Sequence, residues 1–435
     1  MRRLRLIGRF LVIYLVVTLY LWRYFFGRIL TLFLFDRERR RIAVARLRGR
    51  VLCDGMARLG ATFIKLGQVM STRPDLFDRE LIEELRGLQD RLPPFPMKQA
   101  RRIVEEDLGA PVEKLFQSFD EAIAAASVAQ VHRAHRMDGT EVAVKVLRPD
   151  VRQRVERDAS ILLAGARVLE LLPRVRLSEP REHLQHFVQG IIDQTDLEIE
   201  ATNYEKFRTN FANFEGVRFP KVYREQSSKR VLTMEFLRGT KVDELGPGDH
   251  SLVVSRLRNA LLKMLFEDGF IHADMHPGNF VITDASEICI FDVGLCKGLG
   301  EESLVQFIDW NRCLVMGTSE DYVRHLRQYY LRDREDVDWD ALTRDVDEFA
   351  KTFRGKKAIE IETKEIINRA LAIGRSYGLR PMTEMTLIMV AVITCEGVGK
   401  QLDPTSDSLA RIAEYLMPIL MKRGMMDAMI APAVA

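Results

Sequence analysis

The chain has 435 residues, enough for more than one domain, and its 47% apolar and 29% charged content is typical of a folded globular protein. The net charge of +3 is uneven, because residues 1–50 hold 13 arginines against Asp36 and Glu38, so this segment carries +11 and the rest −8. Because residues 51–435 are acidic overall, the sequence argues against a general nucleic-acid-binding protein. The basic segment of residues 1–50 predicts contact with an anionic surface.

Residues 1–50 are also strongly apolar. Leu11–Trp22 is uncharged but shorter than the ~20 residues that a spanning helix needs. Residues 10–35 predict either a spanning helix whose Arg23 and Arg28 snorkel, or a helix lying in the membrane interface. A signal peptide ranks last because no small-residue cleavage site is visible. A buried core helix is disfavoured by the four Trp and Tyr positions, which are typical of membrane interfaces: Tyr14, Tyr20, Trp22 and Tyr24.

Cysteine usage predicts neither a disulfide framework nor a zinc site. The number is odd and no Cys-x-x-Cys pair occurs among Cys53, Cys289, Cys296, Cys313 and Cys395. A reducing compartment fits best.

Helical spacing continues through residues 51–118, with a break at Arg73–Asp75 and a boundary at the prolines of residues 93–96. We expect a helix over residues 98–118. The alternation of Glu141–Val146 then predicts a half-buried strand.

Further along, residues 151–213 predict helices interrupted between Pro173 and Pro180, and Arg230–Gly239 predicts a strand that enters a connector. From Ser251 helices dominate, with strands near 270–282 and 287–295. The amphipathic C-terminal tail predicts a docking helix rather than a span. These patterns place a small mixed lobe in residues 119–237 and a mostly helical lobe in residues 238–435.

The most informative segment is His272–Gly294, "HADMHPGNFVITDASEICIFDVG". Phosphoryl transfer needs a carboxylate that orients the attacking hydroxyl, and oxygen ligands that hold Mg²⁺ on the nucleotide phosphates. Asp274 suits the first role, and Asn279 and Asp292 suit the second, in the chain order of a kinase. An Asp-rich hairpin turn is the alternative.

His272 and His276 are four residues apart, which on a helix would suggest a metal pair. Pro277 and Gly278 argue against a helix here. We therefore expect His272 to brace the loop, with zinc a remote alternative.

Lys145 ends the strand "VAVKV", where a kinase lysine contacts the nucleotide phosphates. A lysine on the polar face of a half-buried strand is the alternative. A helical glutamate should pair with it; Glu198 and Glu200 are the candidates, and Glu200 is preferred.

The nucleotide base and phosphates have candidate neighbours as well. Met234 is expected at the back of the pocket, with the backbone of Glu235 to Leu237 along the adenine edge. Alanines favour helix, but the small residues before the lysine strand occupy the place of a glycine-rich phosphate loop. We predict that these residues form a stiffer lid over the phosphates: Ala124, Ala125, Ala126 and Ser127.

Taken together, the chain resembles the UbiB (AarF-type) atypical protein-kinase-like family. The hallmark is a Lys-x-Gly-Gln motif before the lobes, here Lys65, Gly67 and Gln68. Other family-like blocks follow in family order over residues 50–405: "STRPDL", "LQDRLPPFP", "AAASVAQVHRA", "VAVKV", "HADMHPGN", "FDVG" and "CEGVGKQLDP".

The resemblance implies an α+β, protein-kinase-like two-lobed fold with an N-terminal helical extension over the active site. Lys65 and Gln68 would share one helix face that points into the cleft, in place of an ordinary solvated face. The implied cofactors are ATP and Mg²⁺. The implied role is ATPase or kinase activity in ubiquinone (isoprenoid quinone) biosynthesis or lipid homeostasis.

The implied partners are membrane lipids, isoprenoid-quinone precursors and other quinone-biosynthesis proteins, with no nucleic acid. The kinase-like lobes would lie on the cytoplasmic side of a membrane. Two departures stand out. Gln194, Thr195 and Asp196 replace the family Glu-x-Asp, which removes a carboxylate, and Val293 stands where many kinases have Phe.

Two other function classes remain open. One is a nucleotide-gated lipid-binding protein with little catalysis, which the Gln194 change favours. The other is a true protein kinase, which a Lys-x-Gly-Gln extension over the cleft would disfavour.

Overall fold

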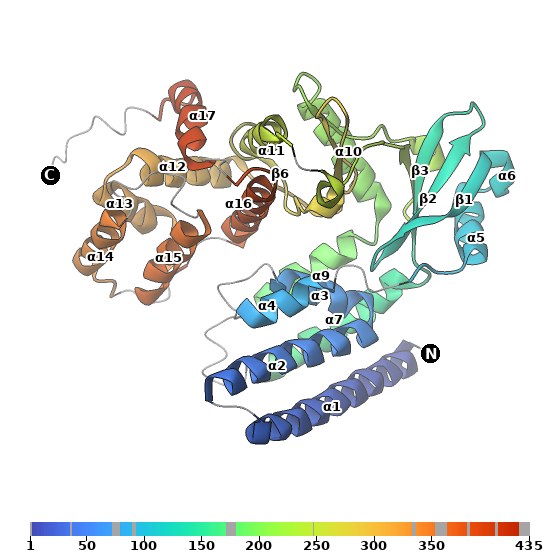
Figure 1. Ribbon diagram of the computed structural model, residues 1–435, viewed down its shortest axis with the longest axis horizontal. Helices are drawn as coiled ribbons and strands as arrows, with labels where there is room; N and C mark the ends of the chain where they lie inside the picture. Colours follow the sequence, from blue (N-terminus) through green and yellow to red (C-terminus); the bar gives the residue numbers. More distant parts are fainter. Residues whose placement is uncertain are drawn as a thin grey trace. The chain divides into compact units, whose positions relative to one another are not determined.

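The chain divides into two compact units. Unit 1 is Met1–Glu205 with Lys221–Phe236, and unit 2 is Lys206–Pro220 with Leu237–Ala435 (Figure 1). The chain last passes from unit 1 to unit 2 between Phe236 and Leu237, inside the Arg230–Gly239 segment that is predicted to be a strand entering a connector. The computed structural model describes residues 2–34, 37–71, 79–88, 93–170, 180–246, 248–332, 336–352, 363–380, 383–404 and 408–425.

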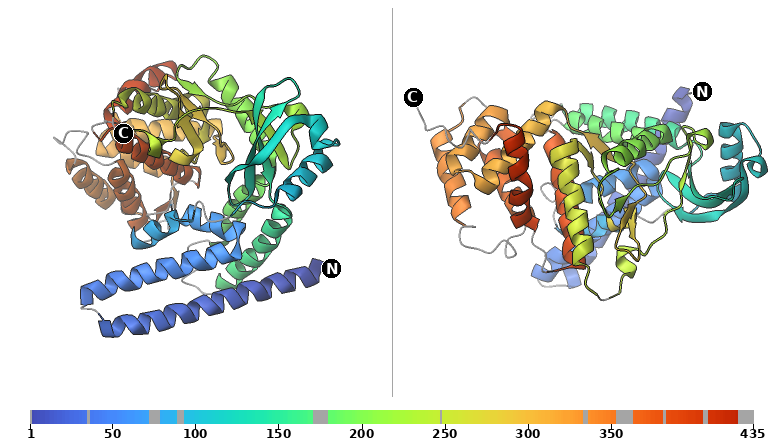
Figure 2. Two further views of the ribbon diagram at one scale, coloured as in Figure 1. Left: turned by 45° about the vertical axis from the view of Figure 1, so that its right-hand side comes forward. Right: turned by 90° about the horizontal axis from the view of Figure 1, so that it is seen from above.

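Unit 1 begins with four helices: α1 (Arg2–Leu34), α2 (Arg37–Leu59), α3 (Ala61–Ser71) and α4 (Arg79–Arg86). α1 and α2 lie side by side and antiparallel (Figure 2). The four helices share a core that includes Val16 of α1, Ile64 of α3 and Leu85 of α4. The predicted boundary after residue 50 falls inside α2, because its helical spacing continues. The predicted break at Arg73–Asp75 lies outside the described residues.

A four-stranded antiparallel sheet follows α5 (Met97–Leu108) and α6 (Val112–Leu115). Its strands, in spatial order, are β1 (Phe116–Ala125), β2 (Ala129–Arg136), β3 (Glu141–Leu147) and β5 (Val231–Glu235). The helix expected over residues 98–118 is wrong at its end. Gly109 adopts φ +72° and closes α5 in the left-handed conformation that glycine tolerates. The chain is therefore extended from Phe116.

β3 is buried on both faces, not half-buried as its alternation predicts. Val142, Val144 and Val146 pack in one core with Ile103 of α5. Residues 143 and 145 point to the opposite face, and they are buried as well. α5 covers the valine face, and on the other face Lys145 contacts Glu200 of α10 (Leu197–Asn210), a burial that the strand pattern alone does not reveal.

Three longer helices complete unit 1: α7 (Val151–Leu169), α9 (Pro180–Asp193) and α10 (Leu197–Asn210), of which the end of α10 belongs to unit 2. They agree with the helices predicted over residues 151–213. Most of the predicted interruption lies outside the described residues, but Pro180 begins α9, where proline fits a first helical turn.

Unit 2 contains short strands and seven α-helices in its described part. The elements are β4 (Val217–Arg218), α11 (Ser251–Lys263), β6 (Phe270–His272), β7 (Phe280–Ile282), β8 (Ile288–Ile290), β9 (Cys296–Gly298), α12 (Glu301–Met316), α13 (Ser319–Tyr329), β10 (Leu331–Arg332), α14 (Trp339–Lys351), α15 (Thr363–Ser376), β11 (Leu379–Arg380), α16 (Thr383–Leu402) and α17 (Ser408–Lys422). β4, β8 and β7 form one sheet, and β6 pairs with β9.

The C-terminal helix α17 packs against α11 and α12, as the amphipathic pattern predicts. Leu416 and Leu420 are fully buried, and the hydroxyl of Tyr415 donates a hydrogen bond to Glu267. All five cysteines are free thiols.

Candidate functional site

The lysine of β3 forms a buried ion pair. Nζ of Lys145 lies 2.7 Å from Oε1 and 2.9 Å from Oε2 of Glu200 on α10. The two side chains are only 9% and 5% exposed, whereas Glu198 is exposed. Lys145 is therefore not a surface charge. Buried charges persist only where partners satisfy them, so this pair holds an ammonium group at a defined position.

The alanine-rich stretch is a β-hairpin and not a helix end. Ala124 and Ala125 pair with β2 as part of β1, and only residues 126–128 form the connection. The amide of Ala126 donates to the carbonyl of Ala129 at 2.8 Å, which closes the turn. None of residues 126–128 has a positive φ, so the turn needs no glycine.

Ser127 is the most unusual residue of this turn. It is 4% exposed, and its Oγ has no hydrogen-bond partner within the part of the chain that the structure describes. A buried hydroxyl without a partner costs free energy. A ligand oxygen placed at the turn would supply that partner.

Arg148 holds the turn from outside, a role that sequence reasoning missed. Its Nε donates to the carbonyl of Ala126 at 3.0 Å, and an Nη donates to that of Pro93 at 2.8 Å. The only signal in the sequence was its position directly after the lysine strand. The turn is thus fixed to the proline segment that precedes α5.

The predicted adenine-facing segment lies at the end of β5. Met234 is buried. The amides of Glu235 and Phe236 donate to the carbonyls of Lys221 and Glu141. Because the amide of Glu235 already donates a hydrogen bond, only its carbonyl oxygen is available for the predicted contact with the adenine edge.

Lys65 and Gln68 lie three residues apart on α3, and both are partly buried. Between them, Gly67 faces the helices of unit 1. A Cβ at this position would come within 2.4 Å of Leu88 Cδ1 and 2.8 Å of Met56 Sδ. The glycine of the motif therefore allows α3 to pack closely on α2 and α4, and this packing sets the position of its neighbours.

In unit 2, Asp274 and Asn279 are joined directly. Nδ2 of Asn279 donates to the backbone oxygen of Asp274 at 2.8 Å and to its Oδ2 at 3.2 Å. This geometry directs the amide nitrogen toward Asp274 and leaves Oδ1 of Asn279 as the atom that can ligate a cation. The amide of Phe291 donates to the carbonyl of Asn279, which connects this loop to the segment carrying Asp292.

His272 braces both loops. Its Nε2 donates to the carbonyl of Asp292 at 2.6 Å, and its Nδ1 accepts from the amide of Asp274 at 3.0 Å. Both ring nitrogens are thereby used, as expected for a structural histidine. Oδ1 of Asp292 in turn accepts from the amide of Gly294 at 2.9 Å, which orients the carboxylate.

The side-chain oxygens of Asp274, Asn279 and Asp292 suit a magnesium-bound nucleotide. Two carboxylates and an amide oxygen are hard ligands, and Mg²⁺ takes few protein groups because it retains water and phosphate oxygens. Among the described residues, no cluster of three or more His, Cys, Asp or Glu side chains is arranged to hold a metal alone. In unit 1, the orphaned hydroxyl of Ser127 and the buried ammonium of Lys145 fit a phosphate group.

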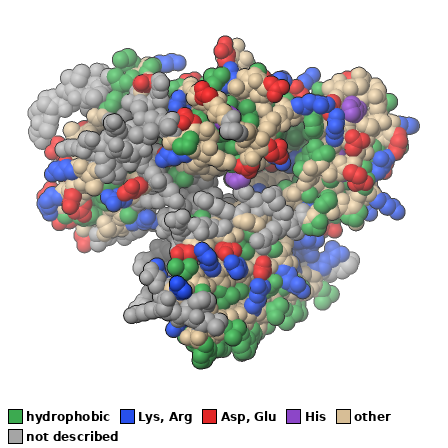
Figure 3. All heavy atoms as spheres, in the orientation of Figure 1, with side chains coloured by type: hydrophobic (Ala, Val, Ile, Leu, Met, Phe, Trp, Pro, Cys, Tyr) green, Lys and Arg blue, Asp and Glu red, His purple; other side chains and the backbone are tan. Residues whose placement is uncertain are grey.

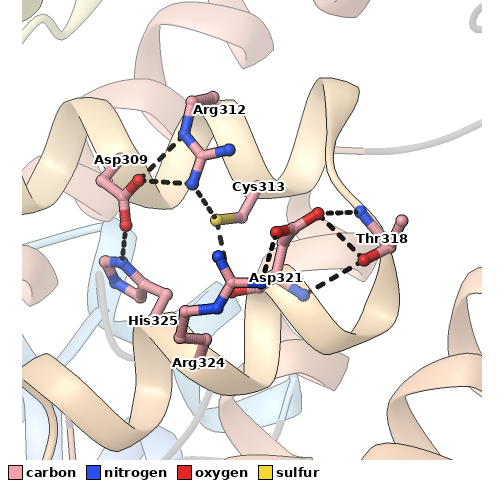
Figure 4. Close-up of polar contacts among 7 residues, drawn as sticks. All are labelled: Asp309, Arg312, Cys313, Thr318, Asp321, Arg324 and His325. Atoms are coloured by element: carbon pink, nitrogen blue, oxygen red, sulfur yellow. Dashed lines mark hydrogen bonds and ion pairs between the residues drawn. The ribbon is translucent and has the colours of Figure 1, made fainter. Parts of the chain in front are cut away.

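A second polar cluster joins α12 to α13, and sequence reasoning did not anticipate it (Figure 4). Asp309 accepts from Arg312 at 2.7 Å and contacts His325 Nδ1 at 2.7 Å. Burial raises the pKa of the nearby Cys313 thiol to about 12. This cluster is a buried structural link between two helices, and its thiol is expected to be unreactive at neutral pH.

Replacement of Asp309 with asparagine should lower stability in a pH-dependent manner. Burial alone would raise the pKa of Asp309, but hydrogen bonds from His325 and Arg312 outweigh it and hold the pKa below its usual value. The stabilisation is therefore complete above the ordinary aspartate pKa of about 3.9 and is lost as pH falls through the lowered value. Urea unfolding should show a loss of about 1.5–3 kcal/mol at pH 7.

Urea unfolding at a pH below the lowered pKa of Asp309 should show a smaller difference in the free energy of unfolding between wild type and Asp309→Asn. The control is Asp284→Asn, since Asp284 is exposed in the β7–β8 turn. An Asp309→Asn difference that is independent of pH would contradict this account.

The segment that departs from the Glu-x-Asp pattern connects α9 to α10. Asp196 accepts from the amide of Glu198 at 3.2 Å and pairs with Arg152 at 3.5 Å, so it caps the helix that carries Glu200. Thr195 is buried, and Gln194 is partly exposed. Gln194, the position without a carboxylate, thus lies in the turn just before the helix that carries Glu200.

Comparisons with known proteins agree with this geometry. Residues 87–324 match the family described as ABC1 atypical kinase-like domain, and residues 346–407 match the UbiB helical domain. The probable protein kinase UbiB of Vibrio cholerae is 32% identical over an alignment of 369 residues that covers 80% of this chain and 66% of that protein.

Two further relatives extend the comparison. The chloroplastic protein ACTIVITY OF BC1 COMPLEX KINASE 7 of Arabidopsis thaliana is 32% identical over 396 residues, 88% of this chain and 56% of that protein. A structure of Rv3197 with erythromycin, from Mycobacterium tuberculosis, matches with a TM-score of 0.53 and 22% identity, covering 78% of this chain and 87% of that one. That match shows the fold alone.

The chain spans less than two thirds of the length of these Vibrio and Arabidopsis relatives. The ABC1 match nevertheless covers more than half of this chain, and it includes the lysine strand, the glutamate helix and the Asp/Asn/Asp loops. The chain therefore belongs to the UbiB family of ABC1 atypical kinase-like proteins.

Proposed function

We propose that this protein is a membrane-associated atypical kinase or ATPase that binds Mg-ATP and supports ubiquinone biosynthesis or lipid homeostasis. The observation that carries the proposal is the buried Lys145–Glu200 pair. A structural role alone would not favour such a pair, because burying two charges often costs as much as their attraction returns. Holding an ammonium for phosphate does favour it.

Each unit supplies a different part of the proposed chemistry. Lys145, positioned by Glu200, binds phosphate oxygens, and the 126–128 turn covers them. Asp274 accepts a hydrogen bond from the attacking hydroxyl or water and orients it. Asn279 and Asp292 would hold Mg²⁺, which neutralises charge on the phosphates.

The membrane and quinone parts of the proposal have separate support. Leu4–Phe33 is a helix long and apolar enough to cross a bilayer, with a mean hydropathy of 1.9 in its most apolar stretch. Family membership supports the quinone role. The proposed partners are membrane lipids and isoprenoid-quinone precursors, and the kinase-like lobes are proposed to face the cytoplasm.

ATP turnover by the full chain tests this function. We expect Mg²⁺-dependent phosphate release that rises when phospholipid vesicles are added and disappears in Asp292→Asn. Unchanged turnover in that variant would refute the assigned role of Asp292. Quinone profiling of a deletion strain, complemented with wild type or Asp292→Asn, then locates the affected pathway step.

Ser127→Ala should separate ligand binding from stability. Removing an orphaned buried hydroxyl should leave the nucleotide-free protein equally stable or slightly more stable. ATP affinity should fall, because the partner of a phosphate oxygen is lost. Thermal unfolding with and without Mg-ATP measures both effects.

The matched control is Ser118→Ala, since the Ser118 hydroxyl already bonds His135 at 2.9 Å. That variant should be less stable with unchanged ATP affinity. Equal ATP affinity in Ser127→Ala and wild type would remove the hydroxyl from the nucleotide site. Ala126→Gly extends the test, since a more flexible turn should alter affinity, whereas strand-paired Ala125→Gly should act mainly on stability.

A second candidate is a nucleotide-gated lipid-binding protein with little catalysis. The absence of a carboxylate at Gln194, in the turn before the helix that carries Glu200, favours it. Extraction of a quinone precursor from vesicles that persists in Asp274→Ala would support this candidate. Gln194→Glu should raise ATP turnover if the missing carboxylate limits catalysis.

A further inference from the structure

One strip of α1 packs against the other helices of unit 1. Ile13, Val16 and Tyr20 belong to a core with α2, α3 and α4. Farther along, a Cβ at Gly27 would lie 2.6 Å from Leu47 Cδ2 of α2. Spacings of three, four and seven residues keep these positions on one helix face, so contact continues along most of α1.

Two arginines on the packed side are fixed by acidic partners. Arg9 donates to both carboxylate oxygens of Asp158 on α7, at 2.5 and 2.8 Å, and Asp158 is fully buried. The same carboxylate accepts from Thr62 of α3 at 2.8 Å. Arg23 donates to Asp54 of α2 at 2.8 Å.

These contacts are incompatible with a membrane-spanning α1. Arg9 and Arg23 are separated by about 21 Å along the helix, so a span across a hydrocarbon core of about 30 Å would take one of these ion pairs into lipid. α2 lies antiparallel beside α1 and contains eight arginines. It would have to enter the hydrocarbon too.

The opposite face of α1 is exposed and apolar. Figure 3 shows hydrophobic side chains gathered along the lower edge of the view, over α1. Trp22 and Phe26 stack at 5.7 Å between ring centroids, and Phe33 is 82% exposed. Other exposed large side chains on this face are Leu4, Ile7, Leu11, Leu15 and Phe25. This is the surface that an interfacial helix presents to acyl chains.

We propose that α1 lies in the plane of an anionic phospholipid leaflet, with its outer face among the acyl chains and the arginines of α2 near the headgroups. The inference rests on the proposed membrane association and specifies its geometry. Charge complementarity favours anionic lipid, because residues 1–50 carry 13 arginines and two acidic residues. The Arg9–Asp158–Thr62 contacts then fix the membrane-bound helix to α3, which carries Lys65 and Gln68.

Tryptophan depth measurements test the geometry. Leu11, Trp22 and Phe33 are 11 residues apart, three turns each, and therefore lie on one helix face. The full chain would carry Trp22 alone on α1, or, in a Trp22→Phe background, Leu11→Trp or Phe33→Trp. Vesicles of phosphatidylcholine and phosphatidylglycerol would contain lipids brominated near the headgroup or near the chain end. The Trp22→Phe signal is subtracted, which removes Trp310 and Trp339.

We expect the same shallow quenching profile at all three positions. A span would place the two outer positions about 33 Å apart, with Trp22 near the midplane and both ends near the interfaces. That result would overturn the in-plane orientation and leave membrane association intact. No quenching and no flotation with vesicles would overturn both, and concentration-dependent self-association without lipid binding would assign the face to a second copy.

Charge removal on α2 tests the choice of lipid. Arg41→Gln with Arg46→Gln removes two exposed charges, and binding to phosphatidylglycerol vesicles should weaken about fivefold per arginine. Binding to pure phosphatidylcholine vesicles should change little. The control is Arg344→Gln with Arg369→Gln in unit 2; an equal loss there would overturn a local role for α2.

Discussion

Replacement of Lys145 with methionine is expected to destabilise unit 1 by about 3–5 kcal/mol. Methionine has a similar length, so the cost comes from Glu200, whose carboxylate stays buried among β3 and α10 without its ammonium partner. Urea unfolding of the full chain, followed by circular dichroism, measures the loss.

The double variant Lys145→Met with Glu200→Leu separates stability from function. The double variant removes both charges of the ion pair, and apolar replacements of buried ion pairs are often neutral or stabilising. Stability should therefore return close to that of wild type. ATP turnover should stay at least about 10²-fold lower, because no ammonium remains for the phosphates.

A surface pair at the same helix provides the matched control. Arg152 contacts Asp196 at 3.5 Å just before α10, and its side chain is 47% exposed. Arg152→Met should cost less than about 1 kcal/mol and leave turnover unchanged. Wild-type turnover in the double variant would show that Lys145 has no role in the reaction, and the buried pair would then be purely structural.

Much of the fold is visible in local sequence patterns. The helices predicted over 151–213 agree with α7, α9 and α10, the strand at Arg230–Gly239 with β5, and the C-terminal docking helix with α17. The helix predicted over residues 98–118 differs from the structure, although Gly109 and Pro111 are residues that typically follow the end of a helix. The strand that begins at Phe116 contains few of the β-branched residues that usually identify strands. It is formed through its pairing with β2.

The candidate site shows a different limit. Lys145 and Glu200 are 55 residues apart, and no local sequence pattern indicates that they pair. Their pairing could be predicted only from the order of motifs in the family. The valine face of β3 is covered by α5, and its other face is buried where Lys145 meets Glu200 of α10. The unpartnered state of the Ser127 hydroxyl depends on how the turn is packed. Sequence patterns identify which side chains can perform the chemistry, whereas burial and partners are set by tertiary packing.

Asp292→Asn and Asp274→Asn should fail in different ways. Asparagine is nearly isosteric with aspartate, and its side-chain oxygen can still accept from the amide of Gly294, as Oδ1 of Asp292 does. The turn should therefore persist, and only the negative charge is lost. Because this charge is assigned to Mg²⁺, the variant should bind ATP without the gain in affinity that Mg²⁺ provides to wild type.

Asp274→Asn should instead retain Mg-ATP affinity. Its side chain and backbone oxygen accept from Asn279, and an asparagine oxygen preserves that geometry, but an amide is a poor acceptor for the proton of the attacking group. Turnover should fall by about 10²–10⁴-fold. Titration with a fluorescent ATP analogue, with and without Mg²⁺, measures binding, and phosphate release measures turnover.

Exposed Asp340 on α14 provides the control, since Asp340→Asn should change neither quantity. The two site variants together distinguish a catalytic site from a binding site. Lost turnover with retained Mg-ATP binding in Asp274→Asn requires that ATP is hydrolysed or its phosphate transferred here. If Asp274→Asn kept full turnover, the carboxylate would not act on the attacking group. If wild type bound Mg-ATP without turnover on any vesicle, the nucleotide-gated lipid-binding function would replace the catalytic one.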